Sequence, residues 1–206
     1  MKEMFKKWFD GLFMPQRTFK NIKREANIKT AVLYVVISSL IAGIIIGLAV
    51  AFIPAIAMWS GLSFYVQLFA GFGVTAKLFG LMLPAITLIG GIVGLFVNVA
   101  IFHLFAYLFG GRARGGFTRQ LYFRSVFAAA LSIISIIILV PIAGLVLVSL
   151  ISIYALYPTI VAIKEAYDFT WGRAILTFIV PIIIFAVIYA IGIFVFLAQT
   201  FGTAMY

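Results

Sequence analysis

Long apolar runs separated by short charged segments make up most of this chain. Four runs carry no charged residue, and they cover residues 30–76, 78–109, 125–163 and 174–206. A helix needs about 20 consecutive apolar residues to cross the hydrocarbon of a bilayer. Each run is therefore long enough for at least one membrane-spanning helix.

Two of these runs have room for a second helix. The run 125–163 contains Pro141 near its middle, with Gly144 just after it. Proline is well tolerated in the first turn of a new helix, so we expect this run to form two spans joined by a tight hairpin. The run 30–76 has 47 residues and allows either one span or two. The chain therefore has five or six spans.

The charges between the runs decide between these two counts. Five spans with the N-terminus inside place fourteen basic residues in the cytoplasm and only Lys77 outside, whereas six spans give nine and six. Short cytoplasmic loops are enriched in Lys and Arg, so five spans are favoured, with the C-terminus outside. We expect an all-α integral membrane protein with spans at about residues 30–57, 78–109, 122–140, 142–164 and 172–200.

Residues 59–76 then lie on the outer face of the membrane. This segment is rich in Phe, Tyr, Trp and Gly. Such a composition suits a segment that lies in the interface, and it also suits one that partly re-enters the bilayer. The sequence leaves both arrangements open.

Residues 1–29 form a charged arm ahead of the first span. Apolar residues recur in it at positions 1, 4, 5, 8, 9, 12 and 13, and charged residues occupy the other helical face up to Pro15. An aromatic face opposite a lysine face is typical of an amphipathic helix in the membrane interface. The predicted membrane-interface residues are Phe5, Trp8, Phe9, Leu12 and Phe13. The alternative is a helix docked on the cytoplasmic loops of the protein itself.

Basic residues continue through the arm to Lys29 and return between the second and third spans. Such clusters attract anionic lipid at about 1 kcal/mol per charge, although topology alone also explains them. The loop at residues 110–116 combines glycines with arginines, which suits a phosphate, but it lacks the ending of a nucleotide-binding P-loop. The predicted lipid- or anion-binding residues are Lys6, Lys7, Arg112, Arg114, Arg119 and Arg124.

Small residues recur at every fourth position in the first two spans. Such stripes let helix backbones approach closely in lipid. The predicted helix-packing residues are Gly43 and Gly47 in the first span and Gly90 and Gly94 in the second. We expect these two spans to pack together within one chain. The alternative use of the stripes is a homo-oligomer.

Four polar or charged residues are candidates for function. Asn98 and His103 lie in the second span, where polar groups are costly and often functional. The alternative is a structural hydrogen bond from His103 to a neighbouring helix. Glu165 and Asp168 end the fourth span, and we expect them to be charge partners of the four arginines between spans two and three rather than catalytic acids.

Composition limits the chemistry that the chain can perform. It is 66% hydrophobic, it has no cysteine, and His103 is its only histidine, so we expect no metal site and no cofactor. The net charge of +10 is explained by membrane topology, and we expect no nucleic acid partner. The motifs of zinc proteases and serine hydrolases are absent, so we expect no enzymatic activity.

Several motifs in order along the chain resemble one family. They are His103-Leu-x-Ala-x-Leu-Phe-Gly-Gly111, Gly116-Phe-Thr-Arg-Gln120, Tyr122 with Ser125, Pro141-x-x-Gly144, Tyr154 and Trp171-Gly-Arg-Ala174, together with Trp8-Phe-Asp-Gly-Leu12 and Pro15-x-x-x-Phe19 in the arm. In these the chain resembles the Yip family of Ypt/Rab-interacting membrane proteins. Many relatives have a proline early in the third span, just after the position of Ser125, and this chain has none at that place.

The resemblance implies five spans and a cytoplasmic N-terminus. Eukaryotic relatives carry a long cytosolic N-terminal region and act with small GTPases in vesicle traffic. This chain has only a short arm, so GTPase binding is not carried over. It resembles the short, prokaryotic-type branch, which implies a location in the cytoplasmic membrane.

These observations favour a non-enzymatic membrane protein that organises the bilayer or recruits a cytoplasmic protein through its basic face. The expected partners are anionic membrane lipids, a cytoplasmic protein and a second copy of the chain. The alternatives are a transporter or channel for a small solute, using Asn98 and His103, and an intramembrane enzyme. A water-filled cavity at Asn98 would favour transport.

Overall fold

The computed structural model describes residues 2–53, 55–56, 60, 62–111, 115–140 and 142–202, and all regular structure in this part is helical. Five stretches are long and apolar enough to span a membrane: Ile28–Phe52, Ala76–Leu108, Gly116–Leu139, Ala143–Tyr167 and Trp171–Phe196. The all-α fold with five spans and an additional N-terminal helix is therefore confirmed. The helices are α1 (Lys2–Phe13), α2 (Pro15–Ile22), α3 (Ile28–Phe52), α5 (Ser63–Ala70), α6 (Ala76–Leu108), α7 (Gly116–Ile134), α8 (Ala143–Tyr154), α9 (Leu156–Tyr167) and α10 (Trp171–Gly202).

Local sequence signals explain where several helices begin and end. The side chains of Asn27 and Thr75 accept hydrogen bonds from backbone N–H groups in the first turns of α3 and α6. Helix α7 continues into a 3₁₀ turn, Ser135–Leu139, before the chain reverses into α8. A Cβ atom at Gly144 would collide with the Ile137 carbonyl oxygen, so this hairpin requires glycine there. Pro141, the predicted break, lies outside the described residues.

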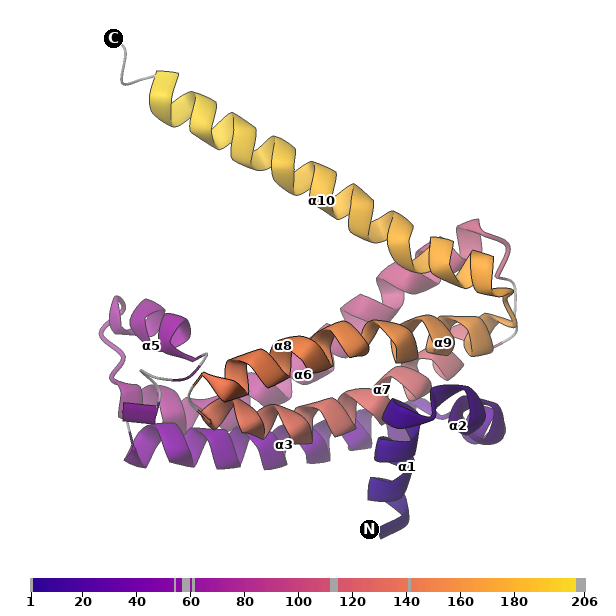
Figure 1. Cartoon of the computed structure of the whole chain (residues 1–206), viewed down its shortest axis with the longest axis horizontal. Helices are drawn as coiled ribbons and strands as arrows, with labels where there is room; N and C mark the ends of the chain where they lie inside the picture. Colours follow the sequence, from indigo (N-terminus) through magenta and orange to yellow (C-terminus); the bar gives the residue numbers. More distant parts are fainter. Residues whose placement is uncertain are drawn as a thin grey trace.

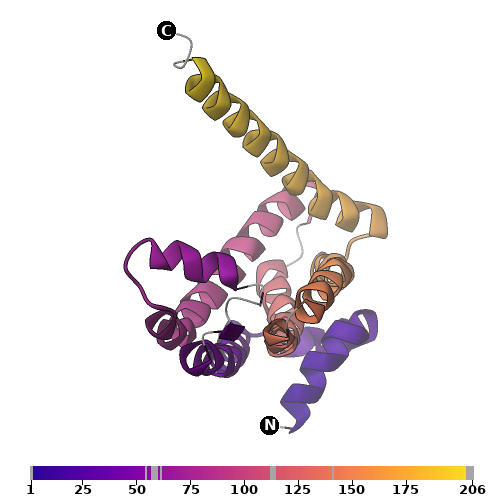
Figure 2. The same cartoon turned by 60° about the vertical axis from the view of Figure 1, so that its left-hand side comes forward.

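Helices α3, α6 and α7 run side by side with the α8–α9 pair in one elongated bundle (Figure 1). The arm helices α1 and α2 lie at one end, together with the α6–α7 and α9–α10 connections, and we call this the basic end. Helix α10 starts there and diverges from the bundle, which Figure 2 shows from another side. Only its first turns pack, through Ala174, Thr177 and Phe178, and residues 182–196 are exposed on all sides. A helix that is apolar all round suits a lipid environment.

The most extensive helix contact joins α3 and α6. A Cβ atom at Gly43 would collide with Thr87, one at Gly47 would collide with the Gly80 carbonyl oxygen, and one at Gly80 would lie 2.6 Å from the Ala51 nitrogen. The Thr87 hydroxyl also donates to the Ser39 carbonyl oxygen at 3.1 Å. The two backbones therefore touch along this stretch, as expected for small residues in lipid.

The prediction for Gly90 and Gly94 is wrong. A Cβ atom at either position would meet nothing within 4 Å, whereas one at Gly91 would lie 2.5 Å from the Ser39 hydroxyl oxygen. The face of α6 that meets α3 carries Gly80, Thr87 and Gly91. Gly90 and Gly94 instead line an open cleft between α3, α6 and α7, so neither brings the two backbones into contact.

Residues 59–76 contain the helix α5, whose eight residues include no buried side chain. Eight helical residues extend only about 12 Å, too short to cross a bilayer. The helix lies at the end of the bundle opposite the arm (Figure 1), where the Phe69 ring packs on Phe79 at 5.0 Å between centroids. The segment is thus attached to the first turn of α6.

Candidate functional site

The arm packs on the bundle as a helical hairpin. Pro15 opens α2, where its fixed φ angle suits a first helical turn. Helix α1 packs on α7, where Gly11 makes room for Val126, and α2 packs on α9. The Phe19 ring stacks on Phe123 at 4.8 Å, and the Tyr154 hydroxyl donates to the Leu12 carbonyl oxygen at 3.2 Å.

The apolar face of α1 is therefore mostly covered by protein. Trp8 and Leu12 have at most 1% of their surface exposed. Both side chains belong to the main core, with Phe5 and Phe9 packed against it. The prediction that Trp8 and Leu12 lie in the membrane interface is wrong, because the bundle itself supplies their apolar surroundings. Phe13 remains 58% exposed and lies next to the exposed Met14.

Ion pairs hold the arm in place. The Lys7 ammonium lies 2.5 Å from the Glu25 carboxylate, which raises the pKa of Lys7 mainly through this hydrogen bond. Lys23 pairs with Asp168 at the end of α9. The arm is thus joined to itself and to the bundle by charge as well as by apolar packing.

Glu165 and Asp168 were predicted to pair with arginines between the second and third spans, and the structure shows such a contact for Asp168. Asp168 lies 3.8 Å from Arg119, one of the expected arginines. Glu165 pairs with its neighbour Lys164 at 2.8 Å, and among the described residues it forms no ion pair with Arg119 or Arg124. The side chain of Glu165 is buried. Arg112 and Arg114 lie outside the described residues.

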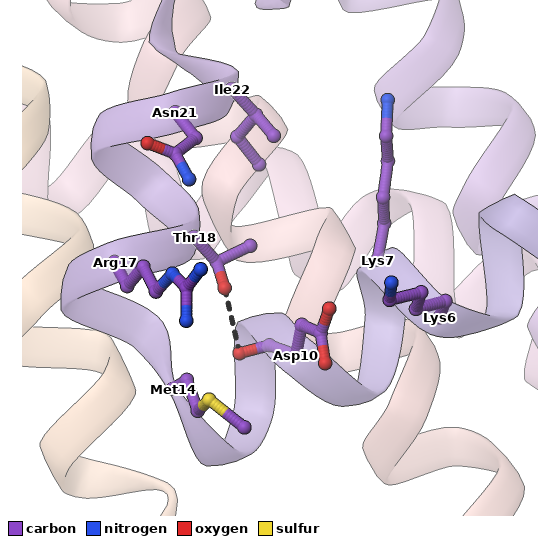
Figure 3. A pocket seen from close by; sticks show the side chains of 8 residues that line it. All are labelled: Lys6, Lys7, Asp10, Met14, Arg17, Thr18, Asn21 and Ile22. Atoms are coloured by element: carbon purple, nitrogen blue, oxygen red, sulfur yellow. Dashed lines mark hydrogen bonds between the residues drawn. The ribbon is translucent and has the colours of Figure 1, made fainter.

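A cleft of about 370 Å³ lies between α1 and α2 (Figure 3). Within it the Thr18 hydroxyl donates to the Asp10 carbonyl oxygen at 3.0 Å and holds the two helices together. Lys6 and Arg17, from α1 and α2, line the same cleft. Its eight lining residues are Lys6, Lys7, Asp10, Met14, Arg17, Thr18, Asn21 and Ile22.

Six exposed cations of the arm are together called the basic platform. They lie on α1, on α2, in the 3₁₀ turn Lys23–Glu25 and in the first turn of α3, and in the described part of the chain they form no ion pairs. Lys6 and Arg17 form its rim at the arm cleft. The members of the platform are Lys2, Lys6, Arg17, Lys20, Arg24 and Lys29.

Aromatic side chains form a belt close to the arm. The Phe13 ring lies 6.3 Å from Tyr154, and Tyr157 stacks on Trp171 at 6.5 Å. Lys164 lies over the Trp171 ring, 5.5 Å from its centre. Tyr and Trp concentrate at the boundary between membrane and water, and lysine suits the water side. The belt marks the expected depth of the headgroups at the basic end.

His103 takes part in a hydrogen-bond chain that joins three helices. The His103 Nδ1 atom lies 2.6 Å from the Tyr167 hydroxyl, which donates to the Gln120 amide oxygen at 2.8 Å. The hydroxyl has one proton, so His103 is the donor to Tyr167 in this arrangement. The Phe117 ring covers the imidazole edge-to-face at 5.3 Å. This geometry supports the structural role for His103.

Asn98 and His103 do not share a site. Asn98 lines a second cleft, of about 250 Å³, between α3, α6 and α7, together with Arg124. The amide oxygen of Asn98 is buried and has no hydrogen-bond partner in the described structure. No group of three or more His, Asp or Glu residues that could hold a metal ion occurs among the described residues.

Sequence reasoning missed three features of this end of the molecule. Helix α2 was not predicted, although Pro15, Phe19 and Ile22 recur at helical spacing and are all buried. Gln120 and Tyr167 were not singled out as partners of His103. Nothing in the sequence signals their meeting, because the three residues come from different helices.

Comparison with known proteins agrees with the family resemblance. The family model described as Yip1 domain matches residues 9–193. The match includes most of the arm and all five candidate spans apart from the end of the last. No curated protein and no solved structure matches the chain.

Proposed function

Since this chain belongs to the Yip1 domain family, we propose that it is a non-enzymatic membrane scaffold that recruits an acidic segment of a cytoplasmic protein. The chain is a polytopic membrane protein with five candidate spans. The observation that carries the proposal is the docked arm, which presents the basic platform from a folded surface. Cations on a fixed scaffold bind with less loss of conformational entropy than cations on a free tail.

The distribution of charge gives the orientation of the protein in the membrane. Lys77 lies at the start of α6, away from the basic end, whereas the twelve other basic residues that the structure describes lie in the arm or in the halves of α7, α9 and α10 nearest to it. Basic residues in short loops remain in the cytoplasm. The basic platform therefore faces the cytoplasm in this proposal.

The packing of the arm favours recruitment over bending of the bilayer. A helix that bends a membrane inserts its apolar face between lipids. Here that face is mostly occupied by the bundle, and among residues 2–14 the exposed large apolar side chains are Phe13 and Met14, at the tip of the hairpin. The arm thus contacts lipid at one point, while its charged side faces away from the core.

The residues that line the arm cleft indicate which chemical groups the proposed partner carries. Lys6 and Arg17 offer cationic groups to a carboxylate, and the cleft also contains the apolar surface of Met14 and Ile22. This combination suits an acidic side chain followed by an apolar one in a peptide. Arg17 also matches the planar geometry of a carboxylate.

Transport is the weaker candidate. Between Asn98 and the end that carries α5, the backbones of α3 and α6 are in contact at Gly43, Gly47 and Gly80. A solute passing between these helices would have to separate them. The packing therefore favours a scaffold over a route between α3 and α6.

A binding experiment with the full-length protein tests the proposal. The protein is placed in nanodiscs of zwitterionic lipid, and a fluorescent peptide of alternating Glu and Leu is titrated by anisotropy. We expect binding that weakens with salt and that is lost in the double variant Lys6→Glu, Arg17→Glu. The matched control Lys77→Glu changes charge at the opposite end and should bind like the original protein.

Two outcomes would contradict recruitment of an acidic peptide. Equal binding by the double variant would show that the platform is not the site. Failure of the peptide to bind, together with tight binding of the same nanodiscs to anionic vesicles, would assign the platform to lipid instead.

A further inference from the structure

Arg124 is a cation inside a candidate span without a carboxylate partner. It lies on α7 and donates to the Thr159 hydroxyl oxygen of α9 at 2.5 Å. Its guanidinium also lies over the Phe127 ring, 5.1 Å from the centre. In the described part of the chain no ion pair includes Arg124, and the nearby carboxylates of Glu165 and Asp168 pair with other cations. A guanidinium has five N–H donors, so most of its bonding capacity is left over.

Asn98 faces the same cleft from the opposite wall. Its amide oxygen is buried and accepts no hydrogen bond in the described structure. A buried acceptor without a donor destabilises the free protein, so a ligand that supplies a donor is favoured. The cleft therefore brings together a cation that lacks an anion and an acceptor that lacks a donor.

The cleft has room for a small polar group. Its volume is about 250 Å³, and it is lined by α3, α6 and α7. Gly90 and Gly94 are exposed along it, and a Cβ atom at either would meet nothing within 4 Å. The hydroxyl-bearing residues Ser39 and Ser132 complete the polar lining. The missing side chains of the glycines keep the cleft open on the α6 side.

The Arg124 end of the cleft lies at the depth of the aromatic belt. Arg124 bonds Thr159, which lies two residues from Tyr157 on α9, and Tyr157 stacks on Trp171 in the aromatic belt. Two helical residues correspond to about 3 Å along the axis. The guanidinium therefore lies near the level at which lipid phosphates meet water.

We propose that this cleft binds the phosphate of a phospholipid headgroup, with Arg124 contacting the phosphate and Asn98 accepting a hydrogen bond from a headgroup hydroxyl or ammonium. Arginine pairs with phosphate through strong, parallel hydrogen bonds. A headgroup that carries O–H or N–H donors can bind Arg124 through its phosphate and donate to Asn98 at the same time. Phosphatidylglycerol and phosphatidylethanolamine have such donors, whereas phosphatidylcholine has none. The site lies in the membrane part of the bundle, apart from the arm cleft. The proposal of lipid binding is therefore independent of the proposal of partner recruitment.

The test measures lipid retained by the full-length protein after delipidation in detergent. Native mass spectrometry is recorded with added phosphatidylglycerol, phosphatidylethanolamine or phosphatidylcholine, and separately with inorganic phosphate as a competitor. We expect the first two lipids to bind more tightly than phosphatidylcholine. Arg124→Gln should weaken phosphatidylglycerol by roughly tenfold to a hundredfold, the loss expected for charge-assisted hydrogen bonds. Asn98→Leu should remove the preference over phosphatidylcholine.

Two further variants separate binding from folding. Gly94→Leu fills the cleft, leaves every polar group in place, and should lower retention of lipid while the melting temperature stays unchanged. Arg119→Gln removes a surface arginine from the same helix and should retain lipid like the original protein. If Arg124→Gln and Gly94→Leu both retained as much phosphatidylglycerol as the original protein, the proposal would be overturned. If inorganic phosphate displaced the lipid, or bound to the delipidated protein without lipid, the cleft would be a site for free phosphate, and the proposal of a lipid ligand would be overturned.

Discussion

Lys23 and Asp168, 145 positions apart in the sequence, form an ion pair that joins the arm to the end of α9. Asp168 has a left-handed backbone conformation (φ 57°) and also lies 3.8 Å from Arg119 of α7. One carboxylate thus connects the arm with the last turn of one span and the first turn of another. The arm is part of the folded bundle rather than a free extension of it.

Removal of this carboxylate should have a small, salt-dependent effect. In Asp168→Asn the new side chain tolerates the left-handed conformation but carries no charge. The carboxylate is 63% exposed, so we expect a loss of only about 0.2–1 kcal/mol of stability. Thermal melting in detergent at low and high salt measures it, and the difference from the original protein should vanish at high salt. A loss that persists at high salt would indicate another role for Asp168.

Trp8 should contribute far more than Phe13, although both lie on the apolar side of α1. Trp8 is fully buried in the core, while Phe13 is 58% exposed. Trp8→Ala should cost about 3–5 kcal/mol and make the arm sensitive to protease. Phe13→Ala should leave melting and proteolysis nearly unchanged. Similar effects of the two variants would indicate that α1 is not docked through Trp8.

The number of spans could be predicted from the sequence because it depends on two local quantities. Apolar length and loop charge are both read without knowing which helices touch. The docking of the arm could not be read in this way. An apolar helix face predicts an apolar surrounding for Trp8, and both a bilayer and a protein core provide one.

The helix contacts were predictable only in part for a similar reason. Gly43 and Gly47 form a stripe on α3, and the structure places both against α6. On α6, small residues recur along much of the helix, and the pattern alone does not say which of them meet α3. A hydrogen bond from His103 to a neighbouring helix was a sound expectation. Its partner Tyr167 comes from a helix 64 positions away, which no local pattern reveals.

Gly47 and Gly94 should respond differently to the same substitution. A leucine at Gly47 would push against the Gly80 carbonyl and separate α3 from α6, so Gly47→Leu should lower stability by about 1–3 kcal/mol or more. Gly94→Leu should leave stability nearly unchanged because its Cβ would point into open space. Melting temperatures of both variants in the same detergent measure this. Equal destabilisation would contradict the open surroundings of Gly94.

The ion pair of Lys7 with Glu25 should stabilise the protein at neutral pH and fail at high pH. The carboxylate raises the pKa of Lys7 above its ordinary 10.5. A raised pKa means that the contribution is present below about pH 10.5 and is lost as the pH rises through the folded-state value. Both side chains are partly exposed, so the contribution is below about 1 kcal/mol. Glu25→Gln should therefore melt earlier than the original protein at pH 8, and the difference should shrink as the pH is raised above 10.5.

The orientation of the chain can be tested by labelling, because the protein has no cysteine of its own. Single cysteines are introduced at Lys20, Asp168 and Phe72, and each variant is treated with a membrane-impermeant maleimide in sealed vesicles of both orientations. Phe72 is 79% exposed beyond the end of α5, and Lys20 is exposed on the basic platform. The positive-inside rule predicts that Lys20→Cys and Asp168→Cys are labelled only from the cytoplasmic side.

Phe72→Cys should be labelled only from the other side, because α3 crosses the membrane once between Lys20 and Phe72. Six spans would place Asp168 on the side opposite Lys20, since an additional crossing would lie between them. Five spans place the two residues together, as their shared contact through Lys23 requires. Labelling of Asp168→Cys and Lys20→Cys from opposite sides would therefore refute both the span count and the docked arm, while labelling of both from outside would reverse the orientation alone.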